Sequence, residues 1–366
     1  MSAQPITLIT TATGKTGRET ALSLLSRGLP VRAMVHRADA RAEALRSRGA
    51  EIVVGNLADV DDIQKALHGV QRAYWAAPTT PGALEAATAF AAVAEEEKLE
   101  VVVAMSQWLA DPGHHSAHTR AAWLTDQVFQ WMPNVGSITV NPGFFAENYM
   151  YTLDAVAQFG FLTLPFGEGL NAPPSNEDIA AVAAALLADP GPHLGRSYRP
   201  TGPELLSTGE FAEILSRILG RTVRYRDVPF VLMAKSARSI GFSDYAVIQL
   251  AWYIDELKRG TFAIDAPTDV VERLTGRPPE DMETIARRYL ATMPGTKRGP
   301  AGMARAMGLL TKSVITPAPN RKRYLHTFQD GAPIGALSID TDLWQTTHAP
   351  DRMRDVQISA TSAVAR

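Results

Sequence analysis

Residues 6–20 constrain the fold more than any other part of the chain. An apolar run, Ile6–Ile9, passes through small residues into a helical pattern that begins near Arg18. Such a strand, turn and helix place backbone N–H groups and a helix N-terminus opposite an anion. Glycine in the turn lets the backbone approach a diphosphate and lets the helix pack closely. The stretch predicts a dinucleotide site formed by Thr11, Thr13, Gly14, Lys15, Thr16 and Gly17.

Two other interpretations of this turn were weighed against a dinucleotide site. Gly14-Lys15-Thr16 is similar to the end of a nucleotide-hydrolase phosphate loop, but that motif needs a glycine where Ile9 stands. The G-x-G-x-x-G spacing has Ala12 in its first glycine position, and the G-x-x-G-x-x-G spacing has Thr11. An imperfect motif by itself leaves open a plain turn that binds no ligand.

Short apolar runs alternate with helical patterns after this turn. The predicted strands are 31–35, 52–54, 73–77, 101–105 and 137–141, and the predicted helices are 18–27, 41–48, 59–67 and 84–97. A parallel sheet covered by helices on both faces produces this alternation. We therefore predict an α/β fold with a doubly wound parallel sheet, whose ligands bind at the carboxyl ends of the strands.

The residues that follow the predicted strands suit a dinucleotide. Arg37 stands where an acidic residue would bind a ribose 2′-hydroxyl, and its guanidinium suits a 2′-phosphate instead. This favours NADP(H) over NAD(H), although a solvated loop arginine is the alternative. The other predicted cofactor contacts are Asn56 and Leu57 near the adenine, Ala76, Ala77 and Pro78 over the fourth strand, Ser106 at the next strand end, and Pro142 and Phe144 at the nicotinamide.

The catalytic group is less clearly indicated. No tyrosine has a lysine four residues later, so the Tyr-x-x-x-Lys pair that places both groups on one helix face is missing. Thr125 or Asp126 would be able to orient a reacting group. His114, His115 and His118 lack a convincing metal-ligand spacing, so we predict no metal and consider a proton-donor role instead. The catalytic candidates are Ser106, His118, Asn148 and Tyr149.

Composition narrows the class of protein. The chain has no cysteine and a formal net charge of −2, which excludes thiolate sites and gives no overall attraction to nucleic acid or anionic membranes. No apolar run approaches the roughly 20 residues that span a bilayer. We therefore expect a cytoplasmic protein with neither a membrane nor a nucleic acid as partner.

The order of these motifs resembles the NmrA-like family of atypical short-chain dehydrogenases/reductases. It comprises the Thr-x-x-Gly-x-x-Gly turn, Arg37, Asn56-Leu57, Ser106 and the Asn141–Asn148 stretch, and it is followed by family-like segments up to about residue 295. The resemblance implies a Rossmann domain that binds NADP(H), over residues 1–150, with a sheet completed by parts of 170–225. It further implies a smaller, mostly helical substrate-side lobe over 151–295.

The resemblance also implies two kinds of function. Family members are reductases of quinones, dyes or phenylpropanoids, or they are non-catalytic sensors of NADP(H). The aromatic-rich lobe suits a flat, apolar small molecule, so we expect an NADPH-dependent reductase of an aromatic or quinone-like compound. A regulator that acts through a protein partner is the alternative, and a homodimer is a further expectation. Residues 296–366 are expected to form an appended tail, basic over 296–323 and with a turn between short strands at Phe328–Ile334.

Overall fold

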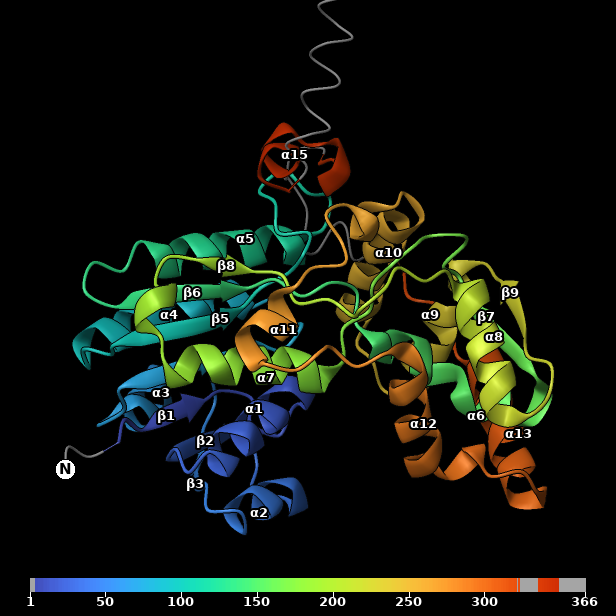
Figure 1. Cartoon of the computed structure of the whole chain (residues 1–366), viewed down its shortest axis with the longest axis horizontal. Coiled ribbons are helices and arrows are strands. Elements are labelled where there is room, and N and C mark those ends of the chain that lie inside the picture. Colours follow the sequence, from blue (N-terminus) through green and yellow to red (C-terminus); the bar gives the residue numbers. More distant parts are fainter. Residues whose placement is uncertain (1–3, 321, 323–334, 349–366) are drawn as a thin grey trace, which may run out of the picture.

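In the computed structural model, residues 4–320, 322 and 335–348 are described, and the predicted turn at Phe328–Ile334 lies outside them. A seven-stranded parallel sheet with the order β3-β2-β1-β4-β5-β6-β8 forms the larger part of the molecule (Figure 1). Its strands are β1 (Thr7–Ile9), β2 (Val31–Val35), β3 (Glu51–Val54), β4 (Arg72–Trp75), β5 (Val101–Met105), β6 (Gly136–Val140) and β8 (Ser197–Tyr198). This order confirms the predicted doubly wound Rossmann sheet, in which the order of successive strands reverses between β1 and β4.

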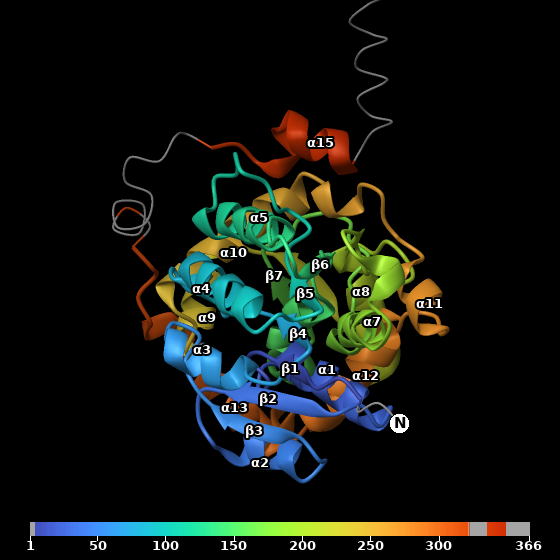
Figure 2. The same ribbon diagram turned by 90° about the vertical axis from the view of Figure 1, so that its left-hand side faces the viewer.

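Helices cover both faces of the sheet (Figure 2). One face carries α3 (Val60–Leu67), α4 (Ala83–Glu96) and α5 (Ala117–Gln130). The other face carries α1 (Lys15–Ser26), α7 (Asn176–Ala188) and α11 (Val270–Thr275). The short helix α2 (Ala40–Arg46) lies beside β3. Adjacent strand residues face opposite sides: Tyr74 packs in the core shared with α1 and α7, and Trp75 in the core shared with α4 and α5. Both strand faces are therefore buried, which explains the continuous apolar runs.

A second, mostly helical lobe lies beyond the carboxyl edge of the sheet (Figure 1). It comprises η1 (Ala146–Thr152), α6 (Leu153–Phe159), β7 (Phe161–Leu164), α8 (Thr208–Leu219), β9 (Arg224–Asp227), α9 (Phe230–Ser239), α10 (Asp244–Lys258), α12 (Met282–Thr292) and α13 (Pro300–Ile315). β7 and β9 pair in parallel as a separate small sheet. Buried aromatic rings, among them Phe144, Phe166 and Phe211, form the lobe's core.

The last described segment docks across the sheet and the lobe, and it includes α15 (Asp342–His348). Ala336 pairs with the backbone around His114, and the buried Trp344 donates from Nε1 to the Trp108 carbonyl at 3.0 Å. The buried Glu256 carboxylate lies 3.2 Å from His114 Nε2 and accepts the Ser338 backbone N–H. The described residues 335–348 therefore tie the loop after β5 to α10, and Trp344 belongs to the lobe's core.

None of the helices in the described part of the chain is long and apolar enough to cross a membrane.

Candidate functional site

The turn after β1 holds Thr11 in a left-handed conformation, with φ of +46°. Such a conformation favours glycine, and a branched residue there is strained. The neighbouring strand compensates, because Thr11 Oγ1 donates to the Ala76 carbonyl at 3.1 Å and Thr10 Oγ1 accepts the Ala76 N–H at 2.8 Å. Gly17 is required by close packing, since a Cβ there would lie 2.6 Å from the Thr11 carbonyl oxygen. The turn thus keeps its tight shape with threonine in the first glycine position.

Helix α1 begins at Gly14, which caps it without a side-chain hydrogen bond. The first backbone N–H groups of a helix lack intrahelical partners and carry the positive end of its dipole. Arg37 lies exposed just past the end of β2 and forms no ion pair with any described residue. Ala77, a small residue, lies past the end of β4. These features fit a dinucleotide laid across the carboxyl edge of the sheet.

Three predicted cofactor contacts have structural roles at this edge. The Asn56 side chain accepts the Ala58 N–H at 3.0 Å and so shapes the loop after β3, while Leu57 packs against the core beside α3. Lys15 Nζ forms an ion pair with Glu147 and lies 2.9 Å from the Tyr151 hydroxyl. Lys15 therefore links α1 to η1, directly beside the predicted diphosphate position.

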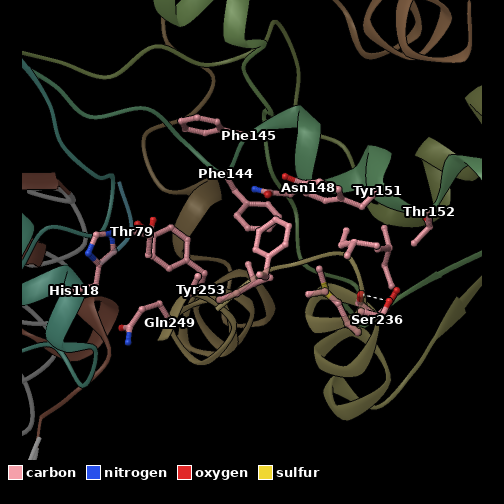
Figure 3. A pocket seen from close by; sticks show the side chains of 18 of the residues that line it. Thr79, His118, Phe144, Phe145, Asn148, Tyr151, Thr152, Ser236, Gln249 and Tyr253 are labelled. Atoms are coloured by element: carbon pink, nitrogen blue, oxygen red, sulfur yellow. Dashed lines mark hydrogen bonds between the residues drawn. The ribbon is translucent and has the colours of Figure 1, made fainter. Parts of the chain in front are cut away.

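A cavity of about 660 Å³ lies between the carboxyl ends of β4, β5 and β6 and the helical lobe (Figure 3). Pro142, Phe144 and Asn148 line its wall after β6, and Tyr253 of α10 stands with its ring 6.4 Å from that of Phe144. Figure 3 shows His118 and Tyr253 toward one end, Phe144 and Asn148 in the middle, and Tyr151, Thr152 and Ser236 toward the other end. The cavity adjoins the position predicted for the nicotinamide.

Ser106 lines this cavity and is backed by a buried carboxyl group. Its Oγ lies 2.5 Å from Asp126 Oδ2, and Asp126 Oδ1 is buried without a hydrogen-bond partner. Burial raises the pKa of Asp126 to about 7, and the Ser106 hydrogen bond opposes that rise. A carboxyl group that holds its proton near neutral pH thus stands one hydroxyl away from the cavity.

His118 also lines the cavity, from the first turn of α5 rather than from a loop. Its ring meets that of Tyr245 edge-on at 6.0 Å, and its Nδ1 is buried without a partner. Burial lowers the pKa of His118 to about 4, so the imidazole is neutral at pH 7. The neutral His118 imidazole can therefore form a hydrogen bond with a ligand, but it is not the protonated imidazolium that a general acid would need at neutral pH.

The three histidines do not converge. His114 accepts the Ser116 N–H at Nδ1 and faces Glu256 through Nε2, and His115 stacks on Trp252 at 4.9 Å. No group of three metal-ligating side chains occurs among the described residues.

The structure differs from expectation for Tyr149. Its side chain is buried in the lobe's core, against the rings of Phe144, Phe166 and Phe211, and it does not line the cavity. Trp108, which follows β5 in the sequence, is likewise buried and does not line the cavity. Both residues follow strand ends in the sequence, but their apolar rings fill the junction between sheet and lobe.

The comparison with known proteins agrees with this geometry. A model of the NmrA-like family matches residues 4–253. The chain belongs to the NmrA-like family. An NAD(P)H azoreductase of Xenophilus azovorans is 30% identical over 291 residues, which make up 78% of this chain and 98% of that relative.

Two solved structures show the same NmrA-like fold. The NADPH-dependent quinone oxidoreductase of Escherichia coli, complexed with NADPH, matches with a TM-score of 0.68 and 21% identity, over 77% of this chain and 99% of that one. NmrA, a negative transcriptional regulator solved in complex with NAD, matches with a TM-score of 0.65 and 18% identity, over 78% of this chain and 95% of that one.

Sequence reasoning missed one wall of the cavity in this NmrA-like chain. Residues of α13, which was expected to belong to an appended tail, line it together with Asp154 of α6 and with α9. The lining residues of α13 are Ala306, Leu309, Leu310, Ser313 and Val314. The amphipathic pattern around Met303–Leu310 was the available signal, but it does not identify the surface that the helix covers.

Proposed function

We propose that this NmrA-like protein is an NADPH-dependent reductase that delivers hydride to an uncharged aromatic or quinone-like electrophile. The observation that carries the proposal is the cavity at the ends of β4–β6, lined by Ser106 with Asp126 behind it. The names of the azoreductase and quinone oxidoreductase relatives support the same class of reaction. In a doubly wound sheet, a substrate at this edge lies against the nicotinamide.

The residues of this chain hold and orient the two reactants. The turn from Thr11 to Gly17 and the N-terminus of α1 bind the diphosphate of NADPH. Arg37 binds its 2′-phosphate, and Pro142 positions its nicotinamide ring. When bound, NADPH supplies the hydride. Phe144 and Tyr253 hold a flat substrate and exclude water from it.

Reduction of a quinone to a hydroquinone consumes one hydride and one proton. Asp126 keeps its proton up to a pH near its raised pKa of about 7, and its Oδ2 lies 2.5 Å from Ser106 Oγ. The Ser106 hydroxyl donates its proton to the substrate oxygen while it accepts the proton of Asp126. A general acid whose pKa lies near the working pH replaces the missing Tyr-x-x-x-Lys pair.

The charge of the cavity wall supports an uncharged substrate. No lysine or arginine is among its described lining residues, and its lining carboxylate, Asp154, is already paired with Arg305 of α13. A sulfonate or carboxylate on the substrate would lose its hydration without gaining a cationic partner. Neutral quinones are therefore expected to be better substrates than sulfonated azo dyes.

Titration with NADPH and NADH, followed by cofactor fluorescence, tests the cofactor. Arg37→Asp is expected to weaken NADPH binding by about 1–3 kcal/mol and to leave NADH binding nearly unchanged, since only NADPH carries the 2′-phosphate. Arg48→Asp is the matched control, because Arg48 is also exposed but does not follow β2. Equal losses for both cofactors in Arg37→Asp would remove the assignment of Arg37 to the 2′-phosphate.

NADPH consumption against neutral quinones, neutral azo dyes and their sulfonated analogues tests the activity. Turnover of the neutral compounds is the expected result. Tight NADPH binding without turnover of any acceptor would instead support a non-catalytic regulator, and NmrA, which shares this fold, is a negative transcriptional regulator.

A further inference from the structure

Exposed apolar side chains of α9 and α13 line the far end of the cavity, and we call this end its mouth. Four residues both line the cavity and remain substantially exposed: Leu232 and Ile240 from α9, and Leu310 and Val314 from α13. The two helices pack against each other (Figure 1). Lys235 Nζ of α9 donates to the Val314 carbonyl at 2.6 Å. Exposed apolar side chains that continue into a cavity are unfavourable in water unless a ligand covers them.

About a fifth of this chain has no counterpart in two of the relatives it matches. The matches take in 98% of the azoreductase and 99% of the quinone oxidoreductase, but only 78% and 77% of this chain. The family match begins at residue 4, so we assign the excess, about a fifth of the chain, to its C-terminal side. The family match includes the reacting end of the cavity and α9, and on this assignment α13 is the added side of the mouth.

We propose that the substrate is an aromatic electrophile with an apolar chain, whose ring lies at Phe144 and whose chain leaves between α9 and α13 past Leu310 and Val314. This inference rests on the proposed reductase function and names its substrate class. The volume of about 660 Å³, part of which the nicotinamide would occupy beside Pro142, falls in the range of small-molecule sites. Each methylene group buried against the mouth adds to binding but not to the chemical step.

A series of 2-alkyl-1,4-naphthoquinones with methyl, hexyl and decyl chains tests the proposal. In the wild type, kcat/KM is expected to rise by about tenfold or more from methyl to hexyl, mainly through a lower KM. Val314→Gln and Leu310→Gln should remove most of this gain, so that kcat/KM for the hexyl compound falls toward that for the methyl compound. Both side chains are exposed, so the substitutions leave the folded core intact.

Ile315→Gln is the matched control. Ile315 is the next residue of α13 and is as exposed as Val314, at 75% against 71%, but it does not line the cavity. It should keep the full dependence on chain length. Equal behaviour of the Val314 and Ile315 variants, or no chain-length gain in the wild type, would overturn the proposal.

Binding of the same quinones, measured by quenching of tryptophan fluorescence, separates this inference from the proposed function. Affinity that rises with chain length and falls in Val314→Gln, with no turnover, would refute the reductase and support the mouth. Turnover with an affinity independent of chain length would support the reductase and refute the proposed role of the mouth.

Discussion

The near end of the cavity and its far end are built differently. The near end consists of loops that follow β4, β5 and β6, where parallel strands hold Ser106 and Pro142 in register and Asp126 is buried behind them. The far end consists of exposed side chains on α9 and α13. The comparison indicates that chemistry is placed on the rigid sheet edge, while substrate selection is placed on helices that are able to vary without disturbing it.

The largest effect should come from the near end. Ser106→Ala removes the hydroxyl that links Asp126 to the cavity, and we expect kcat for quinone reduction to fall by roughly 10²-fold, the lower range for general acid catalysis. NADPH affinity, measured by fluorescence, should change by less than about threefold. A variant with wild-type kcat would show that the proton comes from elsewhere, such as water.

The pH dependence of stability probes the same pair. The folded-state pKa of Asp126 is raised to about 7 from 3.8, so folding favours its protonated form. Its contribution to stability is therefore present at low pH and is lost as the pH rises from about 4 to about 7. Relative to Asp126→Asn, the wild type should lose a few kcal/mol of unfolding free energy between pH 5 and pH 8 in urea titrations. Parallel pH profiles for the two proteins would contradict a buried, protonated Asp126.

The same contrast explains which cavity residues could be predicted from the sequence. Ser106, Pro142 and Phe144 were found because parallel strands bring their ends to one edge, so a position along the chain becomes a position in space. Arg305 of α13 pairs with Asp154, 151 residues earlier, and no local pattern predicts such a contact. Tyr149 was misplaced for a related reason, since spacing alone does not show whether an aromatic ring faces a cavity or a core.

Thr11 offers a smaller test of the near end. Thr11→Val keeps the strained left-handed conformation and loses the hydrogen bond to Ala76, so we expect a loss of about 1–2 kcal/mol in unfolding free energy. Thr11→Gly loses the same bond but relieves strain of about 1–2 kcal/mol, which should leave stability within about 1 kcal/mol of the wild type. Chemical denaturation of both variants measures the difference. Equal stability of the two variants would mean that Thr11 is not strained in the folded protein.

The smallest effect is expected from the ion pair at the far end. Arg305 Nε lies 3.1 Å from Asp154 Oδ2, and the arginine side chain is 54% exposed, so solvent screens the pair. Arg305→Ala should cost less than about 1 kcal/mol of stability, because packing of α13 against α9 and α6 holds the helix. Turnover of the methyl naphthoquinone should remain at the wild-type level, since the chemistry takes place at the strand ends. Urea denaturation measures the effect on the free energy of unfolding. A loss above about 3 kcal/mol would show that one ion pair holds the far wall in place. The contrast between a rigid end that carries the chemistry and a variable helical end would then be wrong.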